Sequence, residues 1–131
     1  MSRILVVDDD EALRRTLCQT LERADYDVVG AADGAAALKL YRQQPVDLVI
    51  TDLIMPEREG IETILELRRL RPDLKIIAVS GGGLMAPAAY LAPARPLGAA
   101  MALAKPFTSE EILQAVASLL NQPYRTFTDA T

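Results

Sequence analysis

Five short apolar runs, separated by segments of helical period, constrain the fold of this chain more than any other feature of its sequence. A strand that reads as a continuous apolar run is buried on both faces, which is typical of a parallel sheet. Parallel strands need crossover connections, and the helices that supply them cover the faces of the sheet. The sequence therefore predicts an α/β fold, with helices on both faces of a five-stranded parallel sheet. The predicted strands are residues 3–7, 27–32, 45–51, 75–80 and 99–104.

The segments between these runs differ in how clearly they predict helices. Leucines recur every fourth residue from Leu13 to Leu21, which indicates a helix after the first strand. Residues 81–98 fit less well, because three prolines interrupt them and an interior proline costs about 3 kcal/mol or more. A short or kinked helix is expected there. The last helix is expected to begin at Thr108, in a T-x-x-E capping box, and to run to about Asn121.

Composition and charge exclude several classes of function. The chain has 131 residues, enough for one domain with a sizeable core, and no stretch apolar enough to span a membrane. A net charge of −4 without a basic run argues against direct binding to nucleic acid. The chain contains no histidine, so it cannot itself be a phosphohistidine donor. Cys18, interpreted as a core residue, is the single cysteine, which together with the lack of a signal peptide favours a cytoplasmic location.

Polar residues stand where four of the predicted strands end. Because ligands of open α/β sheets bind outside the carboxyl ends of the strands, we expect these side chains to share one pocket. Three carboxylates repel one another unless a cation joins them, and oxygen ligands without histidine or thiolate suit Mg²⁺ or Mn²⁺. Asp52 would then be a nucleophile facing the ion, with Ser80 and Lys105 binding phosphoryl oxygens. The residues at the strand ends are Asp8 and Asp9, Asp52, Ser80 and Lys105.

Each of these residues, taken alone, also has an ordinary structural interpretation. Aspartate after a strand is often a helix N-cap, which is the main role expected for Asp10 and an alternative for Asp8 and Asp9. Asp52 and Lys105 could each be turn residues. Their placement at successive strand ends, in this order, favours a shared chemical site over coincidence.

Four motifs, in order across residues 4–107, resemble the receiver domain of bacterial two-component response regulators. The motifs are ILVVDDD, DLVITDLIMPEREG, IIAVSGGG and LAKPF. The resemblance implies a flavodoxin-like (βα)5 fold, which is a doubly wound sheet with strand order 2-1-3-4-5. Residues 1–121 would form this domain, and residues 122–131 are expected to be a frayed tail with no output domain.

The resemblance also implies a Mg²⁺ site, and the oxygen ligand set makes Mn²⁺ a possible substitute. Asp9 and Asp52 match direct ligands of the ion, and Asp8 matches a residue that acts largely through water. The backbone carbonyl of Ile54 matches the remaining protein ligand.

Phosphoryl transfer is the implied chemistry. A sensor histidine kinase or a histidine phosphotransfer protein would pass a phosphoryl group to Asp52, and Ser80 and Lys105 match the hydroxyl and ammonium groups that bind it. The domain would catalyse its own phosphorylation and autodephosphorylation and then alter its contacts with a downstream protein. We expect a monomer or weak dimer that binds neither nucleic acid nor membrane.

The chain departs from the family pattern at three positions that bear on its mechanism. Ala102 stands where the family usually has tyrosine or phenylalanine, so the usual coupling of the hydroxyl to a rotating aromatic ring cannot operate. Ile54 and Gly82 stand where polar side chains would orient the hydrolytic water, so slow autodephosphorylation is expected.

Two other functions stay open as alternatives. A Mg²⁺-dependent phosphohydrolase of the haloacid dehalogenase type also uses a strand-end aspartate. However, Asp52 is followed by Leu53 and Ile54, which omits the second aspartate of that family's D-x-D motif. A pseudo-receiver would be an interaction module that no longer accepts phosphate, although all five site residues are intact here.

Overall fold

The computed structural model describes residues 2–52, 59–80, 101–104 and 106–120 of the chain. Among them, no helix is both long and apolar enough to cross a bilayer. In chain order the elements are β1 (Arg3–Val7), α1 (Glu11–Arg23), β2 (Asp27–Ala31), α2 (Gly34–Gln43), β3 (Leu48–Asp52), α3 (Glu59–Leu70), β4 (Lys75–Ser80), β5 (Met101–Ala104) and α5 (Ser109–Leu119).

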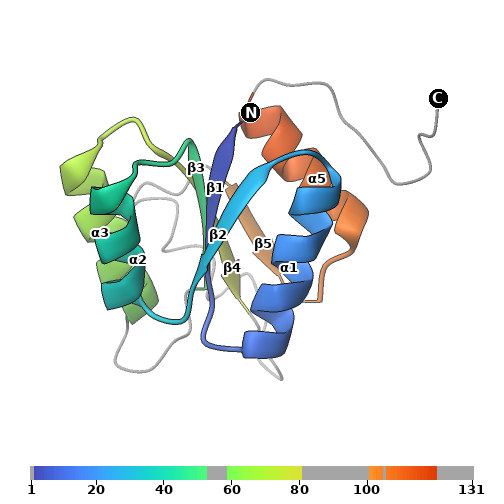
Figure 1. Ribbon diagram of the computed structural model, residues 1–131, viewed down its shortest axis with the longest axis horizontal. Coiled ribbons are helices and arrows are strands. Elements are labelled where there is room, and N and C mark those ends of the chain that lie inside the picture. Colours follow the sequence, from blue (N-terminus) through green and yellow to red (C-terminus); the bar gives the residue numbers. More distant parts are fainter. Residues whose placement is uncertain (1, 53–58, 81–100, 105, 121–131) are drawn as a thin grey trace.

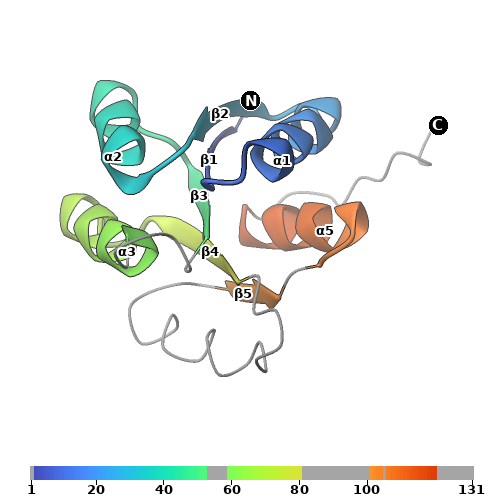
Figure 2. The same ribbon diagram turned by 90° about the horizontal axis from the view of Figure 1, so that it is seen from below.

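The five strands form one parallel sheet (Figure 1), and their order is β2-β1-β3-β4-β5 (Figure 2). The predicted α/β class, the doubly wound sheet and its strand order are therefore confirmed. After β1 the chain adds β2 on one side and then crosses over to add β3 on the other, so the strand order reverses at β1. The crevice that ligands use in such sheets lies at the carboxyl ends of β1 and β3.

Helices cover both faces of the sheet, with α2 and α3 on one face and α1 and α5 on the other (Figure 2). Successive side chains of β1 alternate between two cores. Leu5 and Val7 pack in the core with α2 and α3, whereas Ile4 and Val6 pack in the core with α1 and α5. Full burial of each such side chain contributes about 1.5–3 kcal/mol. The two cores therefore hold β1 firmly up to the acidic turn that follows it.

β3 begins and ends later than the predicted range of 45–51. Pro45 has no N–H to donate to a ladder. Asp47 is tied to β1 instead, because its N–H donates to the carbonyl of Arg3 at 2.8 Å and its Oδ2 accepts from the N–H of Arg3 at 2.8 Å. The later end makes Asp52 the last residue of the strand, which fixes its backbone within the sheet.

Thr108 caps α5 through the predicted capping box. Its hydroxyl accepts a hydrogen bond from the N–H of Glu111 at 3.0 Å, and the carboxylate of Glu111 accepts one from the N–H of Thr108 at 2.9 Å. The helix predicted within 81–98 and the frayed tail predicted at 122–131 lie outside the described residues.

Replacing Thr108 by alanine is expected to lower the free energy of unfolding by about 1 kcal/mol, because an N–H of the first turn loses its acceptor. Ser109→Ala is the matched control, because it removes the hydroxyl of the neighbouring residue, which is exposed and does not cap the helix. It should change the free energy of unfolding by less than about 0.5 kcal/mol. Urea denaturation measures both. Equal effects of the two substitutions would contradict a stabilising cap.

Candidate metal site at the carboxyl edge of the sheet

The pairing of β1 with β3 brings together two aspartates that are distant in sequence. Val7 pairs with Thr51, so Asp8 and Asp52 come next at the carboxyl edge of the sheet. Both are almost fully buried, at 1% and 4% exposure, whereas Asp9 is exposed. One carboxylate oxygen from each of the three aspartates lies within 4.8 Å of the other two. The structure thus places these three predicted residues in a single cluster.

The turn between β1 and α1 is fixed by three hydrogen bonds. The N–H of Asp8 donates to the carbonyl of Ala31 at the end of β2 at 3.1 Å. Oδ1 of Asp8 accepts from the N–H of Asp10 at 2.9 Å. Asp10 is the N-cap of α1, and its own Oδ1 accepts from the N–H of Leu13 at 3.2 Å. Asp10 therefore has the structural role that the sequence predicted for it.

The proximity of three carboxylates favours a divalent cation. Two unit charges about 5 Å apart repel by roughly 3 kcal/mol at an effective dielectric constant near 20. The burial of Asp8 and Asp52 leaves little water to screen that repulsion. Carboxylates are hard oxygen ligands, and Mg²⁺ is typically bound by one or two of them while it keeps several waters. The donor set of the cluster therefore fits Mg²⁺, and also Mn²⁺.

The other predicted site residues are described only in part. Ser80 is the last residue of β4 and directly follows Val79, which pairs with Asp52. The backbone of Ser80 therefore lies at the same edge of the sheet as the carboxylate cluster. Ile54 and Lys105 lie outside the described residues, so their roles stay predictions.

Arg14 contacts the acidic turn in a way that the sequence analysis missed. Its Nη1 donates to the backbone carbonyl of Asp8 at 2.8 Å. A basic residue in the first turns of the helix that follows the acidic run was the available signal.

The nearby Cys18 is half-buried. Burial raises the pKa of its thiol, Glu22 raises it more weakly, and Arg14 lowers it. Cys18 packs against the core with α1 and α5, which agrees with its interpretation from the sequence as a core residue.

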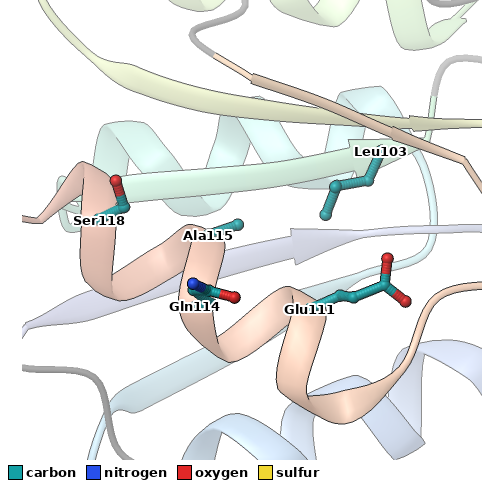
Figure 3. Close-up of a pocket in the computed structure, with 5 residues that line it drawn as sticks. All are labelled: Leu103, Glu111, Gln114, Ala115 and Ser118. Atoms are coloured by element: carbon teal, nitrogen blue, oxygen red, sulfur yellow. The ribbon is translucent and has the colours of Figure 1, made fainter.

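A separate groove of about 340 Å³ lies between β5 and α5. Figure 3 shows Leu103 projecting from β5 toward α5, with side chains of α5 along the opposite wall. None of the three clustered aspartates lines this groove. Its lining residues are Leu103, Glu111, Gln114, Ala115 and Ser118.

Comparison with known proteins identifies the class of domain that this fold and site define. The response regulator receiver domain family matches residues 4–117. The chain is 34% identical over 120 residues to the response regulator receiver protein CpdR of Brucella abortus, which covers 92% of this chain and 98% of CpdR. The solved response regulator receiver domain protein of Clostridium thermocellum superposes with a TM-score of 0.84 at 26% identity, over 92% of this chain and 95% of that one. The chain therefore belongs to the response regulator receiver domain family.

A longer relative shows the same domain as part of a larger protein. The chain is 35% identical over 118 residues to the DNA-binding transcriptional regulator NtrC of Azospirillum brasilense. That match covers 90% of this chain but only 24% of NtrC. Receiver domains of this kind thus occur in proteins of very different length.

Proposed function

We propose that this receiver domain is a phosphorylation-dependent switch of a two-component phosphorelay and that it accepts the phosphoryl group on Asp52. The observation that carries the proposal is the convergence of Asp8, Asp9 and Asp52 within 4.8 Å, in a chain of the receiver family. The donor would be a phosphohistidine of a sensor histidine kinase or of a histidine phosphotransfer protein, since this chain has no histidine.

The nucleophile of the proposed reaction is the carboxylate of Asp52. It lies at the end of a buried strand and is 4% exposed, so it is held in place and largely shielded from water. An oxygen of Asp52 forms a bond to phosphorus while the bond between phosphorus and the imidazole nitrogen of the donor breaks. The electron pair of the broken bond leaves with the imidazole. The same residue would later lose the phosphoryl group to water in autodephosphorylation.

The remaining site residues bind the ion and the phosphoryl oxygens. Mg²⁺, when bound, would neutralise charge that develops on those oxygens. Asp8 already accepts a hydrogen bond from the N–H of Asp10 with one of its oxygens, which supports an indirect role for it through water. The proposed roles are direct metal ligands for Asp9, Asp52 and the carbonyl of Ile54, a water-mediated ligand for Asp8, and phosphoryl binding for Ser80 and Lys105.

The proposed output is a change in the contacts of this domain, residues 1–121, with another protein in the cytoplasm. A net charge of −4 supports an output through protein contacts over direct binding to nucleic acid. We further propose that the domain is a monomer or weak dimer. Because Ala102 replaces the usual aromatic residue, the change must reach the partner by a route that does not use a rotating ring.

Mass spectrometry of the intact protein tests this function after incubation with Mg²⁺ and acetyl phosphate. The expected result is the gain of one phosphoryl group per chain, which hydroxylamine then removes because acyl phosphates are labile to it. Steady release of phosphate from unrelated phosphate esters would instead favour a phosphohydrolase. The absence of any adduct would favour a pseudo-receiver.

A further inference from the structure

Arg14 is hydrogen-bonded to the acidic turn through both its backbone and its side chain. Its backbone N–H donates to the carbonyl of Asp10 at 2.9 Å, as part of the first turn of α1. Its guanidinium Nη1 reaches back and donates to the carbonyl of Asp8 at 2.8 Å. A hydrogen bond from a charged donor is shorter and stronger than one from a neutral donor. Arg14 therefore connects α1 to the peptide bond that joins Asp8 to Asp9.

Gly30 in β2 makes room for the side chain of Arg14. A Cβ atom at this position would lie 3.2 Å from Cδ and 3.3 Å from Cγ of Arg14, and 3.4 Å from Sγ of Cys18. Gly30 does not have the positive φ that would by itself require glycine. Glycine within a strand often marks a place where another group approaches closely. Here that group is the aliphatic part of Arg14, which lies against Gly30 while the guanidinium reaches Asp8.

The backbone must set the direction of the Asp9 side chain. Asp9 is exposed, so packing does not hold its carboxylate, and among the described residues that carboxylate makes no hydrogen bond or ion pair. A peptide group is planar, so fixing the carbonyl oxygen of Asp8 also fixes the N–H of Asp9 and limits the position of its Cα. We infer that Arg14 is a positioning residue, which with Gly30 orients the Asp8–Asp9 peptide so that Asp9 points toward the cation site.

Charge alone would give Arg14 the opposite effect. A guanidinium close to three carboxylates lowers the local negative potential and so disfavours binding of a divalent cation. If that effect dominated, removing the charge would tighten Mg²⁺ binding. If orientation dominates, removing the side chain loosens the turn and weakens Mg²⁺ binding. The sign of the change therefore separates the two roles.

The experiment compares Arg14→Met with Arg15→Met, which removes the same charge one residue further along α1. Arg15 is exposed and pairs with Glu11 at 2.9 Å, without contacting the acidic turn. Isothermal titration with Mg²⁺ should show binding roughly tenfold weaker in Arg14→Met, the usual loss when a partner of a metal ligand is removed. Arg15→Met should bind as the wild type does. Arg14→Lys, which keeps a donor, should recover part of the loss.

Gly30→Ala tests the same contact from the other side. The added methyl group should push the Arg14 side chain by a few tenths of an ångström and weaken Mg²⁺ binding less than Arg14→Met does, and in combination with Arg14→Met it should add nothing further. Additive losses in the double variant would show that the two residues act independently and would overturn their joint role. Mg²⁺ affinity in Arg14→Met equal to or tighter than the wild type would overturn the inference as a whole.

The inference rests on the proposed function, because it assumes that the cluster binds Mg²⁺, so one measurement is made without metal. In metal-free protein, Arg14→Met should speed hydrogen exchange of the amides of Asp8 and Asp10, while Arg15→Met should not. A wild type that binds no Mg²⁺ would refute the proposed function, and the exchange data would still decide whether Arg14 holds the turn. Exchange rates equal in the two variants would refute that role.

Discussion

Asp52→Asn is expected to abolish phosphorylation by acetyl phosphate or by a cognate kinase, with a loss on the order of a thousandfold or more, about 4 kcal/mol in the activation barrier. Asparagine has nearly the same size as aspartate, but its neutral amide is not a nucleophile. The variant should fold normally, because the substitution keeps the size of the side chain and removes one of three mutually repelling charges. In metal-free buffer it should therefore melt at or above the wild-type temperature. Intact mass and a thermal melt are the two measurements.

Asp10→Asn is the matched control for this substitution. It removes the charge of the acidic residue that follows Asp9 in the chain. Asp10 caps α1, and asparagine is as good an N-cap as aspartate, so the helix should be unaffected. The control should be phosphorylated at the wild-type rate. Phosphorylation of Asp52→Asn at that same rate would show that the acceptor is a different residue.

Mg²⁺ is expected to stabilise the wild-type protein, and Asp9→Ala is expected to remove that stabilisation. A ligand that binds only the folded state raises the free energy of unfolding by about 1.4 kcal/mol at ten times its dissociation constant and by about 2.7 kcal/mol at one hundred times. Asp9 is exposed, so truncating it should cost little packing energy. In metal-free buffer the variant should be as stable as the wild type or more so, because it lacks one charge of the cluster. Thermal melts with and without Mg²⁺ measure these effects.

Asp73→Ala serves as the control for Asp9→Ala. The side chain of Asp73 is 83% exposed and pairs with Arg71 at 3.2 Å. Asp73 is not part of the carboxylate cluster. This variant should keep the full increment from Mg²⁺. K⁺ at the same ionic strength should give no comparable increment in any variant. A wild-type melt that does not respond to Mg²⁺ would refute the metal site.

The α/β class with a parallel sheet could be predicted from short-range sequence patterns, whereas the strand order was predicted from the resemblance to the receiver family. Continuous apolar runs identify strands buried on both faces, and Leu5 and Ile4 indeed belong to different cores. The clustering of Asp8 with Asp52 followed from a general property of parallel sheets, in which the carboxyl ends of the strands share one edge. These predictions required no knowledge of particular side-chain conformations.

Hydrogen bonds of polar side chains could not be predicted in the same way. The hydrogen bond of Arg14 to Asp8 depends on the path of a flexible side chain across Gly30, which is distant in sequence. The start of β3 was also missed, because Asp47 and Arg3 exchange hydrogen bonds that no apolar pattern reveals. In both cases a hydrogen bond between a polar side chain and the backbone of another segment decides the outcome.

The pairing of Val7 with Thr51 limits how this protein can change during evolution. Side chains alternate between the two faces of a sheet, so a shift of β1 against β3 by one residue would turn every core side chain of the shifted strand to the wrong face. An inserted or deleted residue within either strand would cause such a shift and would move Asp8 away from Asp52 at the same time. Substitutions leave the pairing in place. Lineages of this domain are therefore expected to gain and lose residues in the connecting loops, while β1 and β3 keep their lengths.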